Sequence, residues 1–293
     1  LLDAAGLRAQ DVDVIGFHGH TVFHSPAEHV SVQIGDGDLL AKQTGIPVVN
    51  RFRNADIANG GQGGPMMASY HAALARDLEK PIAILNIGGV AKMTWIGENG
   101  ELLAFDTGPG NALLDDWMMK KHGTNMDFDG NTAASGTVNE KIVAALMKAP
   151  YFKKQPPKAL DRDEFSVKAA EQLAGESVAD GAATLTAFSA QAAAQAAADF
   201  MPKPAKRWIV CGGGAHNPTM VRFLRQRSGA EILLAREIGW NGDFLEAQGY
   251  AFLAARSLFG LPISFPATTG VPHSMCGGAL HGVPDPLKDK KSR

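Results

Sequence analysis

The alternation of apolar and polar positions predicts a chain that changes repeatedly between strands and helices. Short apolar runs that end at glycine-bearing turns are typical of buried strands, whereas apolar residues that recur every three or four positions are typical of helices. The runs that predict strands are residues 12–17, 47–49, 82–85, 90–96, 102–105, 208–210 and 231–234. The segments that predict helices are residues 66–78, 138–147, 164–173, 180–200, 218–228 and 244–259. This mixed order indicates an α/β protein.

Three of these strands follow one another between residues 82 and 105, with tight turns at Gly88-Gly89 and Asn99-Gly100. Turns of this kind predict an antiparallel meander. A meander does not fit a purely parallel, doubly wound sheet. Two α/β lobes with a cleft between them fit the pattern best, with a boundary near Lys80 and Pro81.

Composition narrows the class of protein. The chain has 293 residues, of which 45% are hydrophobic and 20% charged, as in ordinary soluble globular proteins. The formal net charge of -2 does not suggest binding to nucleic acid or to an anionic membrane. No apolar run approaches the roughly 18 residues that a membrane span needs. Cys211 and Cys276 lie far apart without metal-type spacing, which indicates reduced thiols in a cytosolic protein.

The most informative run is Asp106-Thr107-Gly108-Pro109-Gly110-Asn111, which places a carboxylate at the end of an expected strand. The glycine-rich turn after it opens an amphipathic segment. Such a turn exposes backbone N–H groups at a helix start and suits phosphate. An acid beside a phosphate site indicates phosphoryl transfer or hydrolysis, with the acid as base or metal holder. The alternative is that Asp106 only caps the turn through an Asx hydrogen bond.

Four glycine-bearing turns follow apolar strands, at Gly19, Gly88-Gly89, Gly108 to Gly110, and Gly212 to Gly214. One such turn is weak evidence, because many glycines only satisfy backbone geometry. Several in one chain favour a nucleotide cleft. The chain has no GxxxxGK[ST] motif, and the run that begins at Gly212 lacks the last glycine of GxGxxG. A P-loop and a dinucleotide Rossmann site are therefore not expected.

Polar residues between positions 50 and 65 form a long expected loop that is rich in glycine. Arg51, Arg53 and Asp56 are either surface charges or the wall of a site for a hydroxyl-rich substrate, because a guanidinium binds carboxylates in a bidentate manner. Lys158 and Arg162 flank a proline-rich turn and are expected to be solvated.

Three histidines, His18, His20 and His24, lie close together in the sequence. Their spacing on one loop, without further ligands, is not a strong zinc pattern. Substrate hydrogen bonding or a structural role is favoured over metal binding, and the identity of any metal ligand stays open.

At this point the chain resembles a known family, the anhydro-N-acetylmuramic acid kinases, which belong to the actin-like, sugar-kinase-type ATPases. The matching segments occur in the family's order and span nearly the whole chain. They are residues 15–21, 32–35, 50–58, 60–65, 86–89, 105–111, 156–158, 211–217 and 246–247.

The resemblance implies a two-lobed actin-like (ribonuclease H-like) α/β fold with mixed sheets and a cleft between the lobes. It assigns residues 1–80 plus 266–293 to a sugar-side lobe and residues 81–265 to a nucleotide-side lobe. The family's first phosphate turn, Gly-Thr-Ser-x-Asp-Gly, lies before Leu1. We therefore expect an N-terminal truncation, an incomplete sugar-side lobe and poor turnover by this chain alone.

The resemblance also implies the reaction and the residues that carry it. Water opens 1,6-anhydro-N-acetylmuramic acid, and the freed O6 takes the γ-phosphoryl group of ATP with Mg²⁺, as a step of peptidoglycan recycling. Asp106 is the implied general base. The implied sugar-binding residues are His18, Arg51, Asp56 and Gln62. The implied nucleotide- and phosphate-binding residues are Gly88, Gly89, Thr107, Gly108, Gly110, Asn111, Gly212, Gly213, Gly214 and Asn217.

Three departures from the family pattern affect local contacts more than the reaction. His20 stands where the family usually has Gln, Lys92 where it has Asn, and Ala159-Leu160-Asp161 where it has Ser-Thr-Gly. The expected protein is a cytoplasmic enzyme, a possible homodimer, whose partners are an anhydro amino sugar and ATP rather than nucleic acid or membrane. The alternatives are another sugar kinase, or a non-catalytic sugar-binding or sensing protein on a kinase scaffold.

Overall fold

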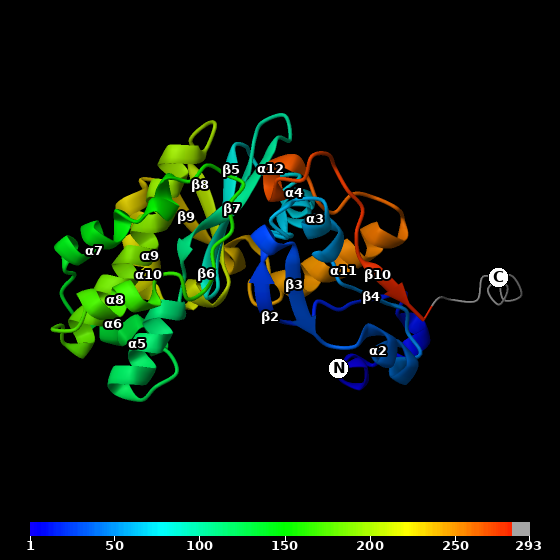
Figure 1. Ribbon diagram of the computed structural model, residues 1–293, viewed down its shortest axis with the longest axis horizontal. Helices are drawn as coiled ribbons and strands as arrows, with labels where there is room; N and C mark the ends of the chain where they lie inside the picture. The colour runs from blue at the N-terminus through cyan, green and yellow to red at the C-terminus, as the bar shows by residue number, and fades with distance from the viewer. Residues whose placement is uncertain (283–293) are drawn as a thin grey trace, which may run out of the picture. The chain divides into compact units, whose positions relative to one another are not determined.

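The computed structural model describes residues 1–282, and the chain forms two compact units (Figure 1). One unit comprises Leu1–Tyr70 and the chain from Glu246 onward, and the other comprises His71–Leu245. We call them the terminal unit and the central unit. The sequence placed the boundaries at 80/81 and 265/266, later in the chain than this division. Residues 283–293, which the resemblance assigned to the sugar-side lobe, lie outside the described residues.

A five-stranded sheet in the order β7-β6-β5-β8-β9 forms the centre of the central unit. Its strands are β5 (Ile82–Ile87), β6 (Val90–Ile96), β7 (Leu102–Pro109), β8 (Arg207–Cys211) and β9 (Glu231–Leu234). β5, β6 and β7 form an antiparallel meander, whereas β8 and β9 continue the sheet parallel to β5. The expected meander and the mixed α/β class are therefore confirmed.

Helices pack together on one side of this sheet (Figure 1). They are α5 (Ala112–His122), α6 (Asn131–Ser135), α7 (Glu140–Met147), α8 (Ser166–Gln172), α9 (Val178–Phe200) and α10 (Pro218–Ser228). α9 is rich in alanine, the residue with the highest helix propensity, and begins where the Ser177 side chain accepts a hydrogen bond from the Asp180 N–H. α10 begins at an Asn217 cap followed by Pro218, as the sequence predicts.

The terminal unit contains a small mixed sheet and a separate hairpin. In the sheet, β4 (Val48–Asn50) pairs parallel with β1 (Ile15–Gly16) and antiparallel with β10 (Ala279–His281). The hairpin consists of β2 (His20–Ser25) and β3 (Val30–Ile34), which the sequence analysis does not predict. The expected strand over residues 12–17 is only two residues long.

The helices of the terminal unit are short, apart from one. They are α1 (Leu2–Ala5), α2 (Gly37–Thr44), α3 (Asn54–Ala58), α11 (Leu245–Leu258) and α12 (Pro266–Thr269). The chain passes from one unit to the other within α4 (Ala68–Leu74) and at the start of α11. The prediction of an irregular loop over residues 50–65 is wrong in one respect, because the short helix α3 lies within this segment.

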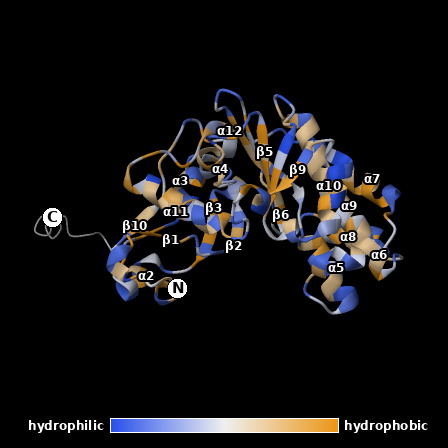
Figure 2. Cartoon of the chain, turned by 180° about the vertical axis from the view of Figure 1, so that it is seen from behind, coloured by the Kyte–Doolittle hydropathy of each residue, from blue (hydrophilic) through white to orange (hydrophobic). Residues whose placement is uncertain are grey.

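Each unit has its own hydrophobic core, which is the physical basis of the division. Buried sheet residues such as Met93 and Phe105 pack with Trp117 and Phe188 in the central unit. Phe52 belongs to a second core, formed entirely by residues of the terminal unit. Figure 2 shows the strands of the central sheet as largely hydrophobic.

Candidate active site

Asp106 lies in β7, the edge strand of the central sheet, and a distant segment covers that edge. The Asp106 N–H donates to the Lys158 carbonyl at 2.9 Å, and the Tyr151 hydroxyl donates to the Asp106 carbonyl at 2.6 Å. The backbone of Asp106 is thus held on both sides, and the residue is only 4% exposed. A segment about fifty residues later in the chain therefore fixes the position of the carboxylate.

The two oxygens of the Asp106 carboxylate have different surroundings. Oδ2 accepts a hydrogen bond from the Leu160 N–H at 2.9 Å. Oδ1 is buried and accepts no hydrogen bond from any residue between 1 and 282. The nearest cation is the Lys92 ammonium, 3.7 Å from Oδ1. The Asx-cap alternative is wrong, because this carboxylate binds Leu160 and not the turn that follows it. A buried acceptor without a partner costs free energy and calls for a functional explanation.

Lys158 is buried directly beneath this strand, so the expectation that it is solvated is wrong. Its ammonium lies 4.4 Å from the centre of the Phe200 ring and 4.6 Å from that of Tyr151, and it donates to the Tyr151 carbonyl at 3.3 Å. Burial lowers the pKa of Lys158 to about 8. Burial, with the negative charge of Asp106, also raises the pKa of the Tyr151 hydroxyl, which keeps it a donor.

The turn after Asp106 uses several of its backbone donors within the protein. The N–H groups of Gly110, Asn111 and Ala112 donate to the carbonyls of Gly88 and Gly89, at 2.8–3.2 Å. These three groups are therefore not free for phosphate, contrary to the expectation that the turn exposes its donors. These hydrogen bonds do bring together two of the expected phosphate-binding turns, the one at Gly88-Gly89 and the one at Gly108 to Gly110.

Thr107 and Gly108 serve the packing of this turn. The Thr107 hydroxyl is buried and donates to the Ala91 carbonyl at 3.2 Å. A Cβ at Gly108 would lie 2.7 Å from the Ala192 Cβ on α9, so only glycine fits here. The Ser189 hydroxyl of the same helix donates to the Gly110 carbonyl at 2.8 Å. Helix α9 therefore supports the turn directly.

The turn at Gly212–Gly214 lies close to the turns at Gly88-Gly89 and Gly108–Gly110, at the carboxyl end of the sheet's parallel strands. β8 runs parallel to β5, so the carboxyl ends of the two strands lie side by side. Gly212 has φ +78, and a Cβ on Gly213 would lie 3.4 Å from the Asn111 amide nitrogen. Asn217, which follows this turn, uses its side chain to cap α10 through the Met220 N–H at 2.9 Å.

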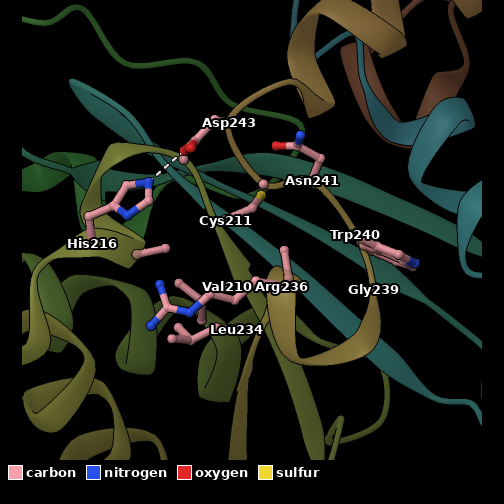
Figure 3. A pocket seen from close by; sticks show the side chains of 13 residues that line it. Val210, Cys211, His216, Leu234, Arg236, Gly239, Trp240, Asn241 and Asp243 are labelled. Atoms are coloured by element: carbon pink, nitrogen blue, oxygen red, sulfur yellow. Dashed lines mark hydrogen bonds and ion pairs between the residues drawn. The ribbon is translucent and has the colours of Figure 1, made fainter.

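A cavity of about 350 Å³ opens beside Gly212, at the carboxyl ends of β8 and β9 (Figure 3). Val210 and Leu234 form part of its apolar wall, and His216 pairs with Asp243 at 2.5 Å. Its size and mixed lining are typical of a small-ligand site. Sequence reasoning missed the wall at residues 234–243. The adjacent carboxyl ends of two parallel strands could have indicated it.

In the terminal unit, His18 and Arg51 line one polar cavity of about 250 Å³. They follow β1 and β4, which are parallel neighbours, so both strand ends open at the same place. Asn50, Asn54 and Gln33 complete much of the polar wall. Arg51 has φ +52, a conformation that non-glycine residues rarely adopt and that clusters at functional sites.

His18 is held as a neutral ring. Burial and the charge of Arg53 lower its pKa to about 4. Nδ1 lies 2.9 Å from the Gly19 carbonyl, so it carries the hydrogen, and Nε2 accepts from the Arg53 Nε at 3.1 Å. The ring also stacks on Tyr250 with centroids 4.5 Å apart. Sequence reasoning missed Tyr250, which lies on a helix without a motif around it.

Asp56 and Gln62 lie in the same unit but do not line that cavity. Asp56 is 1% exposed, and its Oδ1 accepts from the Gly63 N–H at 2.6 Å. Its Oδ2 is buried without a partner among residues 1–282. The Gln62 N–H donates to the Thr269 carbonyl at 2.6 Å. These contacts shape the glycine-rich loop around Asp56.

The described part of the chain contains no group of three or more His, Cys, Asp or Glu side chains placed to hold a metal ion. The histidines near the start of the chain therefore do not form such a group. Within residues 1–282, none of the helices combines the length and apolar character needed to cross a membrane.

A fixed carboxylate at the end of a strand, glycine turns along the same sheet and a ligand-sized cavity at its other strands are compatible with a phosphoryl-transfer enzyme, and the comparisons with known proteins show the class to be that of kinases. The family model described as anhydro-N-acetylmuramic acid kinase matches residues 1–282. The chain belongs to this family.

Curated relatives carry the same description. The one from Paramagnetospirillum magneticum is 55% identical over 280 residues, which cover 96% of this chain and 79% of the relative. The one from Methylobacterium nodulans is 54% identical over 275 residues, covering 93% and 72%. The one from Rhodospirillum rubrum is 51% identical over 266 residues, covering 90% and 70%.

Two solved structures show a loose likeness of fold to this chain. Component A of (R)-2-hydroxyglutaryl-CoA dehydratase from Acidaminococcus fermentans is 13% identical, with 86% of this chain and 79% of that chain covered and a TM-score of 0.47. The activator of 2-hydroxyisocaproyl-CoA dehydratase from Clostridium difficile is 16% identical, with 66% and 68% covered and a TM-score of 0.42.

Proposed function

We propose that this protein opens 1,6-anhydro-N-acetylmuramic acid with water and phosphorylates the freed O6 with ATP, giving N-acetylmuramic acid 6-phosphate for peptidoglycan recycling. Family membership supports the reaction. The observation that carries the mechanism is the Asp106 carboxylate, with one oxygen held by Leu160 and the other without a hydrogen bond. Family membership does not favour a non-catalytic sugar sensor.

In this mechanism, Asp106 acts as general base through Oδ1. A water oxygen attacks the anomeric carbon, and one water proton passes to Oδ1. The bond between the anomeric carbon and O6 breaks, and O6 attacks the γ-phosphorus. The bond to the β-phosphate oxygen then breaks, ADP leaves, and Asp106 releases its proton to solvent. Oδ1 is covered in the ligand-free state, so substrate binding must bring the water to it, as is common for catalytic groups.

We place ATP in the central unit. The cavity beside Gly212 has room for a nucleoside, and its apolar wall suits the faces of a base. The phosphates extend toward Gly88-Gly89, the Asn111 amide, and Gly213-Gly214. Thr107, Gly108, Gly110 and Asn217 support these turns from within the fold. Mg²⁺ brought with ATP would offset negative charge on the β and γ phosphates.

We place the sugar in the polar cavity of the terminal unit. Arg51 binds the lactyl carboxylate, because a guanidinium matches a carboxylate with two parallel hydrogen bonds. His18 is a neutral ring whose two nitrogens bind Gly19 and Arg53, so it forms part of the cavity wall and does not donate a proton to the sugar. Asp56 and Gln62 lie outside this cavity, and their part is to shape the glycine-rich loop of the same unit. We further propose that the enzyme is cytoplasmic, forms a homodimer and otherwise has small-molecule partners.

The test is an ADP-release assay with 1,6-anhydro-N-acetylmuramic acid and ATP on the full-length protein that contains this chain. Asp106→Asn keeps the shape of the side chain but removes the base, so turnover should fall by about 10²- to 10⁴-fold. Calorimetry should still show binding of both substrates. Asp116→Asn is the matched control, because Asp116 is exposed and pairs with Arg162. Unchanged turnover in Asp106→Asn would refute the base, and a wild-type protein that binds sugar without releasing ADP would refute the kinase.

A further inference from the structure

Lys92 faces Asp106 across two neighbouring strands. It lies in β6 and is the direct partner of Asp106 in β7. Directly opposed residues point to the same face of a sheet, so their side chains meet. The pairing shifts register between Ala91 and Lys92, and such an irregularity commonly re-aims a side chain beside an active site. The result is a contact of 3.7 Å between the Lys92 Nζ and the Asp106 Oδ1.

The contact involves the one carboxylate oxygen that nothing else binds. Leu160 holds Oδ2, whereas Oδ1 has no hydrogen bond. Within residues 1–282, Lys92 is the only cation in ion-pair range of Asp106, and the Lys92 ammonium donates no hydrogen bond to another group. The Lys92 side chain is 37% exposed and that of Asp106 is 6% exposed. The ammonium therefore keeps much of its hydration, while the carboxylate has lost most of its own.

The length of this contact leaves the oxygen able to react. At 3.7 Å the pair interacts by charge but lies beyond hydrogen-bond distance. The lone pairs of Oδ1 are therefore not occupied by the ammonium and can take a proton from water. The ammonium therefore attracts the carboxylate oxygen without blocking it.

We propose that Lys92 is a positioning residue that acts through Asp106, holding Oδ1 in the orientation that water activation requires. This inference rests on the proposed function. Two other polar groups face Asp106 from elements packed against it. They are the Lys158 ammonium, which is directed into the aromatic rings, and the Tyr151 hydroxyl, which is bound to the Asp106 carbonyl. Lys92 alone approaches Oδ1.

The experiment measures kcat and the KM values of sugar and ATP at pH 7 for the full-length wild-type protein, Lys92→Met and Lys92→Arg. Methionine keeps the length of the side chain without its charge. In Lys92→Met, kcat should fall by about tenfold. Both KM values should stay within about twofold of the wild type, because Lys92 acts through Asp106 and does not bind the substrates. Lys92→Arg should restore most of the rate.

Controls separate this role from a structural one. Lys42→Met removes an exposed lysine that also pairs with a carboxylate, and it should leave kcat and both KM values unchanged. Thermal melting shows whether each variant is folded. An active wild type with an unchanged kcat in Lys92→Met overturns the role of Lys92, as does a loss of rate that arginine does not restore. A wild type without kinase activity instead overturns the proposed function.

Discussion

Replacing the buried Lys158 by methionine should change how the stability of the central unit depends on pH. Burial lowers the pKa of Lys158 to about 8 from an ordinary 10.5. The unfolded chain therefore binds more protons than the native state between these values, so stability rises with pH across that window. Methionine fits the aromatic surroundings of Tyr151 and Phe200 without a charge.

The magnitude follows from the two pKa values. At pH 7.5 the ionisable Lys158 side chain lowers the unfolding free energy by about 3 kcal/mol relative to a neutral side chain, and at pH 9.5 it lowers it by about 1.4 kcal/mol. The unfolding free energy of the wild type should therefore rise by about 2 kcal/mol between these two pH values because of Lys158. In Lys158→Met this position should make no contribution to the pH dependence. The lost hydrogen bond to the Tyr151 carbonyl costs about 1 kcal/mol at both values and cancels in the comparison.

Urea unfolding followed by tryptophan fluorescence measures this unit selectively. All four tryptophans, Trp95, Trp117, Trp208 and Trp240, belong to the central unit. The quantity to compare is the difference in unfolding free energy between variant and wild type at pH 7.5 and at pH 9.5. Lys42→Met, which removes an exposed lysine, should show the same difference at both. An equal difference at both pH values for Lys158→Met would refute the claim that the buried amine has a depressed pKa.

Two further predictions follow from single contacts. Gly108→Ala places a Cβ 2.7 Å from the Ala192 Cβ, so it should lower the unfolding free energy of the central unit by about 1–3 kcal/mol in the same urea assay. An unshifted midpoint would contradict this packing. Because burial and Arg53 hold the pKa of His18 near 4, the dissociation constant of the sugar, measured by calorimetry, should show no inflection near pH 6.5. An inflection that disappears in His18→Asn would show that the ring titrates normally.

The elements that the sequence predicts well are those with strong local signals. The meander from β5 to β7 has tight turns, α9 has its alanines, and α10 has both its cap and its proline. The hairpin of β2 and β3 was missed although Val30, Val32 and Ile34 alternate with polar residues. Their apolar side chains are exposed in the structure, so this pattern did not mark a buried face.

Site residues were predictable where a motif places them directly after a strand. His18 and Arg51 meet because β1 and β4 are parallel neighbours, a pairing that no local pattern indicates. The cavity wall at residues 234–243 has no periodicity and was not found. The His18 ring is held by a hydrogen bond from Arg53 and by stacking on Tyr250, and Tyr250 comes from a helix more than two hundred residues later.

The way in which Asp106 is held explains why a departure from the family pattern leaves its position intact. Ala159-Leu160-Asp161 replaces the usual Ser-Thr-Gly, yet this segment binds Asp106 through backbone atoms. The Lys158 carbonyl accepts from the Asp106 N–H, and the Leu160 N–H donates to Oδ2. Any residue except proline supplies that N–H. The segment must therefore keep its course along β7, which the buried Lys158, the Tyr151 ring and the packing of Leu160 in the core secure, while the side chains at 159 and 161 can vary.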